Sequence, residues 1–379
     1  MATQSSTTDA ASETPPAAVP AVHGGLAKHE YFWRDRQPWL QEHGYLLRPR
    51  YRPDWKPSWL ESGRFYMLCE DGQSPLMDTI LDATRQSDGL LVILKVVDTV
   101  IHPFEVEIGQ FLSSDPMVQD PRNRCVRILA VLQDPIEPQK SILVMPLLKP
   151  FREPKFLTFG EVVVFMKQAI EGLRFMHEHH VAHRDISILN VMMDARPMYS
   201  EKLWHPWMSI YNRNFSGRAK HYSRTERPVN YLYIDFGLSR KYDPADCPPR
   251  ELPILGGDKS VPEFQDDGYD VPSDPFRTDI YYLGNLIRST FLNRYHGFGF
   301  MEKLVADMVQ DDPEKRPTIA EVETRFDEIS RRMWSWKLRS RLVRKGENIL
   351  LSAVRGTRHL FRTARFISKR LPAVPTPSS

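Results

Sequence analysis

Apolar residues recur at helical spacing between residues 158 and 176. Thr158 and Glu161 form the Thr-x-x-Glu pattern that caps the start of many helices. The apolar positions that follow are separated by four, three, four and three residues: Val162, Met166, Ala169, Leu173 and Met176. Because this spacing lines one face of a helix, the segment is predicted to be a long amphipathic helix.

Three apolar runs have the length of strands: residues 90–97, 141–148 and 231–234. We expect the first strands to begin near Arg64. Later in the chain, a second capping box at Thr318 and Glu321 starts another amphipathic helix. The chain thus contains both strand-length runs and amphipathic helices, as a mixed α+β fold does.

The first 60 residues differ in composition from the rest of the chain. Residues 1–27 are rich in Ser, Thr, Ala and Pro, with few apolar side chains to bury, and are predicted to be disordered. Residues 28–60 are dense in Trp, Arg and Pro. We expect this extension to lie extended over the strands, anchored by four tryptophans: Trp33, Trp39, Trp55 and Trp59. The alternative is an arm that contacts a peptide or a nucleic acid.

The C-terminal residues 334–379 form a basic amphipathic tail. Residues 331–370 contain 13 Lys and Arg and one acid, Glu347. One face of the predicted helix is apolar (Leu350, Val354, Leu360, Phe361, Ala364, Ile367) and another is basic (Arg355, Arg358, Arg362, Arg365, Lys369). Such a helix fits an anionic membrane surface, an acidic partner, or docking onto the acidic remainder of the chain. No nucleic-acid recognition motif accompanies it.

Length and composition limit the class of protein. With 379 residues and 41% hydrophobic residues, the chain can form one sizeable domain with tails. It shows neither a signal-peptide pattern nor a run of about 18 apolar residues that could span a membrane. Three cysteines without metal-ligand spacing fit a reducing intracellular compartment, cytoplasmic or nuclear.

The chemistry is concentrated in two short segments. Residues 183–190 read His-Arg-Asp-Ile-Ser-Ile-Leu-Asn, in which Asp185 can accept a proton from a hydroxyl and Asn190 can bind a metal ion. Residues 235–237, Asp-Phe-Gly, follow the strand-like run 231–234. Asp235 there can bind Mg²⁺, although Asp-x-Gly after a strand is also a common turn.

These segments resemble the protein-kinase superfamily. Three later segments also match it in order: Val-Pro-Glu at residues 261–263, the Asp279 helix at residues 279–284, and Arg316, whose family counterpart pairs with Glu263. More narrowly, residues 33–38, 47–51, 190–199 and 274–276 resemble the protein-kinase-domain orphans of mushroom-forming fungi.

The resemblance implies a two-lobed kinase fold, with a small β-rich lobe at residues 61–148 and a larger helical lobe at residues 149–333. It implies ATP and Mg²⁺ as cofactors and a protein hydroxyl, Ser or Thr, as substrate. Asn190 and Asp235 would hold Mg²⁺, and Asp185 would act as the base.

Further site residues follow from the same resemblance. Lys95, within the apolar run, would hold the nucleotide phosphates and pair with Glu105 or Glu107; the alternative is a lysine at a strand edge. Met145 would be the gatekeeper, and Leu147 and Leu148 would contact adenine. Arg184 would pair with a phosphate or with an acid of the segment that follows Asp235, for which Asp243, Asp246 and Glu251 are candidates.

Three departures from the family pattern bear on activity. Residues 70–77 hold one glycine and Pro75 where the family has a glycine-rich loop, so fewer backbone N–H groups can approach phosphates. Ser187 stands where a lysine usually contacts the transferred phosphate, and residues 195–230 form a long insertion that we expect to be at least partly packed. A pseudokinase scaffold and a small-molecule kinase are therefore the alternative functions.

Overall fold

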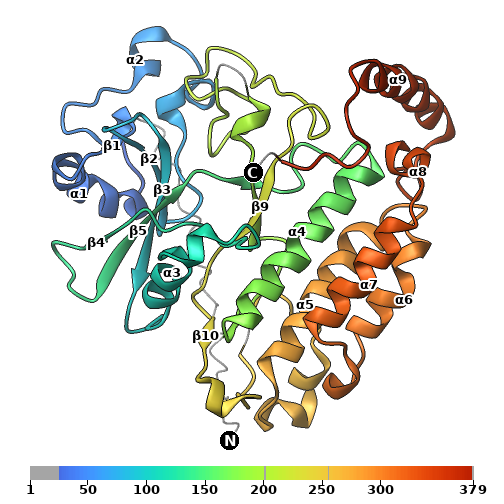
Figure 1. The fold of residues 1–379 in the computed structure, drawn as a ribbon. Helices are drawn as coiled ribbons and strands as arrows, with labels where there is room; N and C mark the ends of the chain where they lie inside the picture. The colour runs from blue at the N-terminus through green and yellow to red at the C-terminus, as the bar shows by residue number, and fades with distance from the viewer. Residues whose placement is uncertain (1–24, 200–201, 255, 378–379) are drawn as a thin grey trace, which may run out of the picture.

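The computed structural model describes residues 25–199, 202–254 and 256–377. Of the tail predicted to be disordered, residues 1–27, residues 1–24 lie outside the described residues. The chain has a mixed α+β fold, as predicted. A curled antiparallel sheet occupies one side of the molecule, and most of the helices occupy the other (Figure 1).

The main sheet has five antiparallel strands in the order β1-β2-β3-β5-β4. Their bounds are β1 (Tyr45–Leu47), β2 (Ile80–Arg85), β3 (Leu91–Asp98), β4 (Ala130–Gln133) and β5 (Lys140–Pro146). Two of the three predicted apolar runs are β3 and β5, which pair so that Lys95 lies opposite Leu143. Helix α3 (Glu105–Ser113) follows β3.

The N-terminal extension belongs to the sheet core, so the prediction that it lies extended was wrong. Tyr31–Glu42 forms helix α1, and β1 is the edge strand that pairs with β2. Trp33 is fully buried, and its indole N–H donates to the carbonyl of Asp78 at 2.9 Å. Because Trp33, Leu40 and Leu47 pack with the buried side chains of β2 and β3, the domain begins before the predicted boundary at residue 61.

Residues 48–79 contain no strand, so the expectation of strands near Arg64 was also wrong. The segment folds into short turns and helix α2 (Ser58–Ser62). Buried polar groups hold it: Arg48 donates to the carbonyl of Gln73 at 2.7 Å, and Arg50 donates to that of Asp71 at 2.7 Å. The carboxylate of Asp71 in turn accepts from the hydroxyl and the N–H of Ser58.

Helix α4 (Phe159–Glu178) is the predicted amphipathic helix and forms the centre of the helical side (Figure 1). Thr158 caps it by accepting from the N–H of Glu161 at 3.2 Å. The carboxylate of Glu161 instead accepts from the N–H of Leu157 and from the N–H and hydroxyl of Thr225, so the reciprocal half of this capping box does not form.

Further helices pack in this region: α5 (Pro275–Ile287), α6 (Gly299–Met308), α7 (Ile319–Arg331) and α8 (Ser335–Arg339). The capping box at Thr318 and Glu321 is complete at the start of α7.

Two small sheets hold the loops that carry Asp185 and Asp235. One pairs β6 (Lys149–Pro150), β8 (Val191–Asp194) and β9 (Asn230–Tyr233), and the other pairs β7 (Val181–Ala182) with β10 (Arg240–Lys241). Residues 183–190 therefore run from β7 to β8, and Asp235 follows β9. Strand β9 covers most of the third predicted apolar run.

The insertion, residues 195–230, packs on the body as expected. Trp204 is buried, and the indole N–H of Trp207 donates to Asp82 of β2 at 2.9 Å. Arg213 also pairs with Asp82, at 2.6 Å. The insertion is thereby tied directly to the main sheet.

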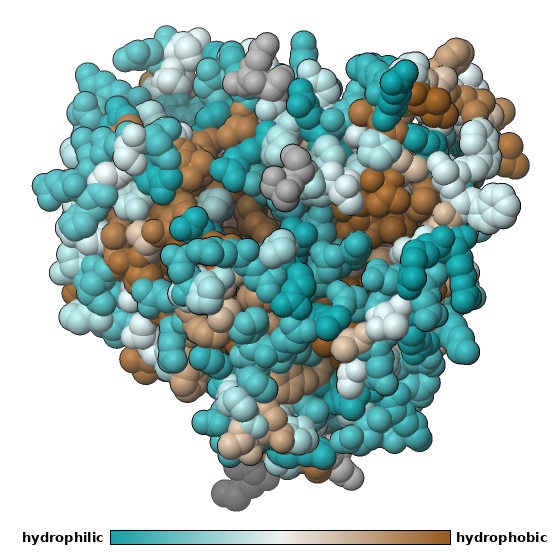
Figure 2. Space-filling view, in the orientation of Figure 1, coloured by the Kyte–Doolittle hydropathy of each residue, from teal (hydrophilic) through white to brown (hydrophobic). Residues whose placement is uncertain are grey.

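The predicted tail helix is α9 (Ile349–Ser368). It contacts the rest of the chain through buried His359, Thr363 and Phe366 and through an Arg365–Glu226 ion pair at 3.2 Å. The apolar face is exposed, with Leu350 78% and Phe361 75% accessible, and Figure 2 shows hydrophobic surface at this position. Within the described ranges, no helix is long and apolar enough to cross a membrane.

Candidate active site

Three separate elements bring Lys95, Glu105 and Asp235 together. The Lys95 ammonium on β3 donates to Glu105 on α3 and, at 2.8 Å, to Asp235 after β9. Glu107, the alternative partner, is exposed. Burial opposes a charge on Lys95, but the two carboxylates outweigh it and raise the pKa of Lys95. Burial also opposes the charge on Asp235, but Lys95 outweighs it and lowers the pKa of Asp235.

Asp279 fixes the start of the loop at residues 183–190 by accepting hydrogen bonds from its backbone. This fully buried carboxylate accepts from the N–H groups of His183 and Arg184, both at 2.7 Å. Arg184 has φ of +67°, a conformation that few side chains adopt without support. The two hydrogen bonds from Asp279 provide that support.

Asp185 is held by Asn190 of the same loop. The Asn190 amide donates at 2.8 Å to both the carboxylate and the carbonyl of Asp185. Burial raises the pKa of Asp185, against smaller opposing contributions from the hydrogen bonds that it accepts. A partly buried carboxylate with a raised pKa has the properties of a general base.

The second oxygen of Asp185 accepts a hydrogen bond that the sequence did not predict. The N–H of Gly257 donates to it at 2.6 Å. A Cβ atom on Gly256 would lie 2.5 Å from the same oxygen, so only glycine permits this approach. The Gly-Gly pair in the segment after Asp235 was the available signal, because consecutive glycines often mark close backbone contact.

Two ion pairs anchor the segment that contains Gly257. Arg184 lies 3.7 Å from Glu251, which makes Glu251 its partner among the three acids considered. Further along, Arg316 binds Glu263 through two hydrogen bonds of 2.8 and 2.6 Å, and the Arg316 side chain is fully buried. The predicted pairing of Arg316 with Glu263 is thus observed.

The segment expected to contact adenine follows β5. Met145 pairs with Ile93 in the sheet, and Leu147 and Leu148 are buried. The N–H of Leu147 donates to the carbonyl of Leu91 at 3.1 Å, which fixes this segment to β3.

The structure shows both departures that bear on phosphate binding, the loop at residues 70–77 and Ser187. Residues 70–72 form a single 3₁₀ turn, and a Cβ on Gly72 would clash with the carbonyl of Tyr66, so this glycine serves local packing. The Ser187 hydroxyl accepts from the N–H of Leu189 at 3.2 Å and brings no positive charge to the loop.

The donor set suits Mg²⁺ shared with phosphates. Asn190 and Asp235 offer an amide oxygen and a carboxylate, and Mg²⁺ typically takes one or two such groups and completes its shell with phosphate oxygens and water. Over residues 25–199, 202–254 and 256–377, no cluster of three or more His, Cys, Asp and Glu forms a metal site by protein groups alone.

In comparisons with known proteins, the sequence matches no family model and no curated protein. We therefore infer function from the geometry of these residues.

Proposed function

We propose that the protein is an ATP-dependent protein kinase with a two-lobed kinase fold, working inside the cell. The observation that carries this proposal is the convergence of Lys95, Glu105 and Asp235 beside a loop in which Asn190 orients Asp185. These five residues come from four parts of the chain, and phosphoryl transfer needs this set of a phosphate-binding cation, metal-binding oxygens and a base.

Each residue has a role that its contacts support. Lys95, positioned by Glu105, would bind phosphate oxygens of ATP. Leu147 and Leu148 would contact the adenine, with Met145 as the gatekeeper. Mg²⁺, held by Asn190 and Asp235, would neutralise charge on the phosphates when bound. Asp185 would orient a substrate hydroxyl and take its proton as the oxygen attacks the γ-phosphorus. The bond between that phosphorus and the β,γ-bridging oxygen would break, and ADP would leave. Arg184 and Glu251 would keep the neighbouring segment in place.

The experiment is phosphate transfer from labelled MgATP to a panel of peptides and proteins. Asp185→Asn should lower transfer by at least about 100-fold, while the melting temperature and MgATP affinity stay close to wild type. Asp243→Asn, at an exposed acid of the following segment, is the matched control and should transfer normally. Equal turnover by wild type and Asp185→Asn would overturn the assignment of the base.

A pseudokinase scaffold is the second candidate, and one contact favours it. The Gly257 N–H occupies one of the two carboxylate oxygens of Asp185 and so covers part of the proposed base. Folded wild-type protein that binds MgATP but transfers no phosphate to any substrate would support this candidate. A small-molecule kinase is disfavoured by the Arg316–Glu263 pair, which the resemblance associates with protein kinases.

We further propose an anionic membrane surface, rather than an acidic protein, as the partner of α9. The helix combines an exposed apolar face with a tail of net charge +12 over residues 331–370, from 13 basic residues and one acid. Apolar side chains that enter the headgroup region beside basic ones are typical of helices that lie on membranes.

A further inference from the structure

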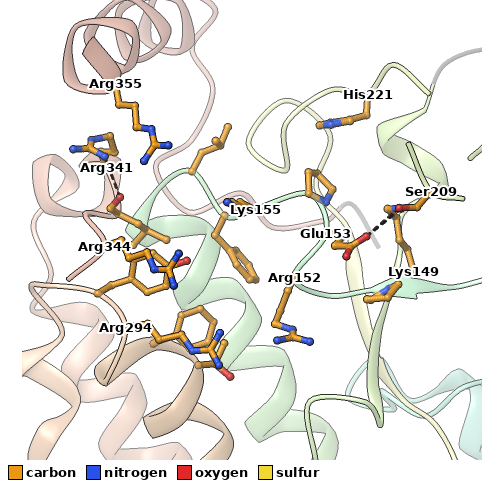
Figure 3. A pocket seen from close by; sticks show the side chains of 18 of the residues that line it. Lys149, Arg152, Glu153, Lys155, Ser209, His221, Arg294, Arg341, Arg344 and Arg355 are labelled. Atoms are coloured by element: carbon orange, nitrogen blue, oxygen red, sulfur yellow. Dashed lines mark hydrogen bonds and ion pairs between the residues drawn. The ribbon is translucent and has the colours of Figure 1, made fainter. Parts of the chain in front are cut away.

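A cavity of about 900 Å³ lies apart from the candidate active site. Its walls come from residues 149–157, the insertion, residues 290–295 after the end of α5, and the C-terminal tail including α9 (Figure 3). Neither Lys95, Asp185, Asn190 nor Asp235 lines it. Its volume is in the range that holds a small molecule rather than a polymer.

The cavity is strongly cationic. Ten of its lining side chains are Lys or Arg and two are Glu, an excess of eight positive charges. Both acids are already engaged. Glu347 pairs with Arg341 at 2.9 Å and with Arg355 at 3.5 Å, and Glu153 accepts from the hydroxyl of Ser209 at 3.1 Å.

Several of the basic groups have no anionic partner. Among residues 25–199, 202–254 and 256–377, no carboxylate lies within 4.0 Å of Arg344, Arg358 or Arg362. Lys149 is 97% buried, and its Nζ has no hydrogen-bond partner among the same residues; its nearest carboxylate, Glu153, is 4.0 Å away. Burial lowers the pKa of Lys149 to about 8. Such a cluster of like charges is costly without an anion.

The positions of the basic groups favour an anion with several charged groups. In Figure 3, Lys149 and Arg152 lie on one side of the cavity, and Arg341, Arg344 and Arg355 lie on the other. A ligand with a single carboxylate would reach the basic groups of one wall only. Guanidinium groups bind phosphate with two parallel hydrogen bonds, and the aromatic floor, which includes Phe156 and Tyr295, strengthens such contacts by excluding water.

We propose that this cavity binds a ligand that carries two or more phosphate groups. The shared chemistry allows two sources, a multiply phosphorylated lipid headgroup or a free polyphosphorylated small molecule. Because α9 contributes Arg355, Arg358 and Arg362 to the cavity while Leu350 and Phe361 remain exposed, the protein could bind such a headgroup while its apolar face enters the bilayer. The site requires no catalysis, so its test is independent of kinase activity.

The test uses the full chain and two probes. Inositol hexakisphosphate is the soluble probe, measured by titration calorimetry. The second probe is phosphatidylcholine vesicles that contain phosphatidylinositol bisphosphate. The comparison vesicles carry the same total charge, which phosphatidylserine supplies instead. The variant Arg344→Gln/Arg358→Gln/Arg362→Gln removes three cavity charges. The control Arg331→Gln/Arg332→Gln/Arg370→Gln removes three charges of the basic stretch 331–370 that lie outside the cavity.

We expect saturable binding of inositol hexakisphosphate by wild type and by the control variant, and at least tenfold weaker binding by the cavity variant. Vesicle binding that prefers the bisphosphate lipid and falls in the cavity variant identifies the lipid headgroup; soluble binding alone identifies a free ligand. Equal weakening by both variants indicates diffuse charge attraction and overturns the proposal. Absence of saturable soluble binding by folded wild-type protein also overturns it.

Discussion

Gly257 donates its N–H to the carboxylate of Asp185 at 2.6 Å across 72 positions of the chain. The contact covers one oxygen of the proposed base. In a working kinase the segment around Gly257 would have to move, or the substrate hydroxyl would have to use the other oxygen, which Asn190 holds. This one hydrogen bond therefore separates the two candidate functions.

Gly256→Ala should displace this segment from Asp185. The new Cβ would lie 2.5 Å from the carboxylate oxygen, and relief of that overlap should cost about 1–3 kcal/mol of unfolding free energy. If the segment covers the base, phosphate transfer should rise severalfold despite the lower stability. Gly257→Ala is the matched control, because its Cβ would make an ordinary 3.4 Å contact. A fall in transfer rate for Gly256→Ala would mean that the segment positions Asp185.

Glu105→Gln should weaken MgATP binding and destabilise the fold. The change leaves the largely buried Lys95 with Asp235 as its remaining charged partner, which should cost about 2 kcal/mol. Calorimetry with MgATP and denaturant unfolding measure the two effects. Glu107→Gln, on the exposed side of α3, should change neither. The same losses in both variants would contradict the assignment of Glu105.

Asp82 should make the fold sensitive to acid. Burial tends to raise its pKa, but Arg213 and Arg48 outweigh burial and lower it to about 2. A depressed pKa stabilises the fold above the unfolded value near 3.9, and this contribution is lost as the pH falls from about 4 to 2, by about 2.5 kcal/mol in all.

Denaturant unfolding at a series of pH values checks this contribution. Asp82→Asn should be less stable than wild type at neutral pH, and the difference should shrink below pH 4. Asp54→Asn, at an exposed acid of the N-terminal extension, should follow the wild-type curve. A constant difference between wild type and Asp82→Asn at every pH would refute the prediction.

Glu263→Gln should be strongly destabilising. It leaves the fully buried guanidinium of Arg316 without its two-pronged carboxylate partner, a loss of about 3–5 kcal/mol. Glu314→Gln breaks an exposed pair with Arg250 and should cost less than about 1 kcal/mol. Thermal unfolding of the two variants compares them directly, and similar melting temperatures would be inconsistent with the buried pair.

Leu350→Ser/Phe361→Ser should reduce binding to phosphatidylserine vesicles without lowering the melting temperature. Both side chains are exposed, so their loss removes membrane contact and little packing. Leu76→Ser/Val100→Ser changes two equally exposed apolar residues elsewhere and serves as the control. Vesicle binding that is unaffected by the α9 substitutions would argue against membrane contact through this face.

Local sequence patterns were sufficient to predict several helices, strands and loops. The apolar run around Lys95, the helix that begins after Thr158 and the loop from His183 to Asn190 each have a spacing that specifies an element. The choice between Glu105 and Glu107 was open, because residues two apart on a helix point to different sides and only packing decides which one faces Lys95.

Long-range relationships left little trace in the sequence. The density of Arg and Trp around α1, together with Pro38 inside the helix, obscured its helical pattern, although tertiary packing of Trp33 stabilises it. The contacts of Asp82 with Arg213 and of Asp185 with Gly257 join residues far apart in sequence. The Gly-Gly pair at residues 256–257 indicates a close backbone contact but does not identify Asp185 as its partner.

Strand β1 has only three residues, yet it caps the hydrogen-bonding edge of β2. Without it, the main sheet would present an open strand whose side chains include Leu81 and Ala83, both buried in the intact chain. Open edges of this kind recruit strands from other molecules and start aggregation. The Trp- and Arg-rich N-terminal segment moves the sheet edge from β2 to the three-residue strand β1, and a very short edge strand offers little backbone for such pairing.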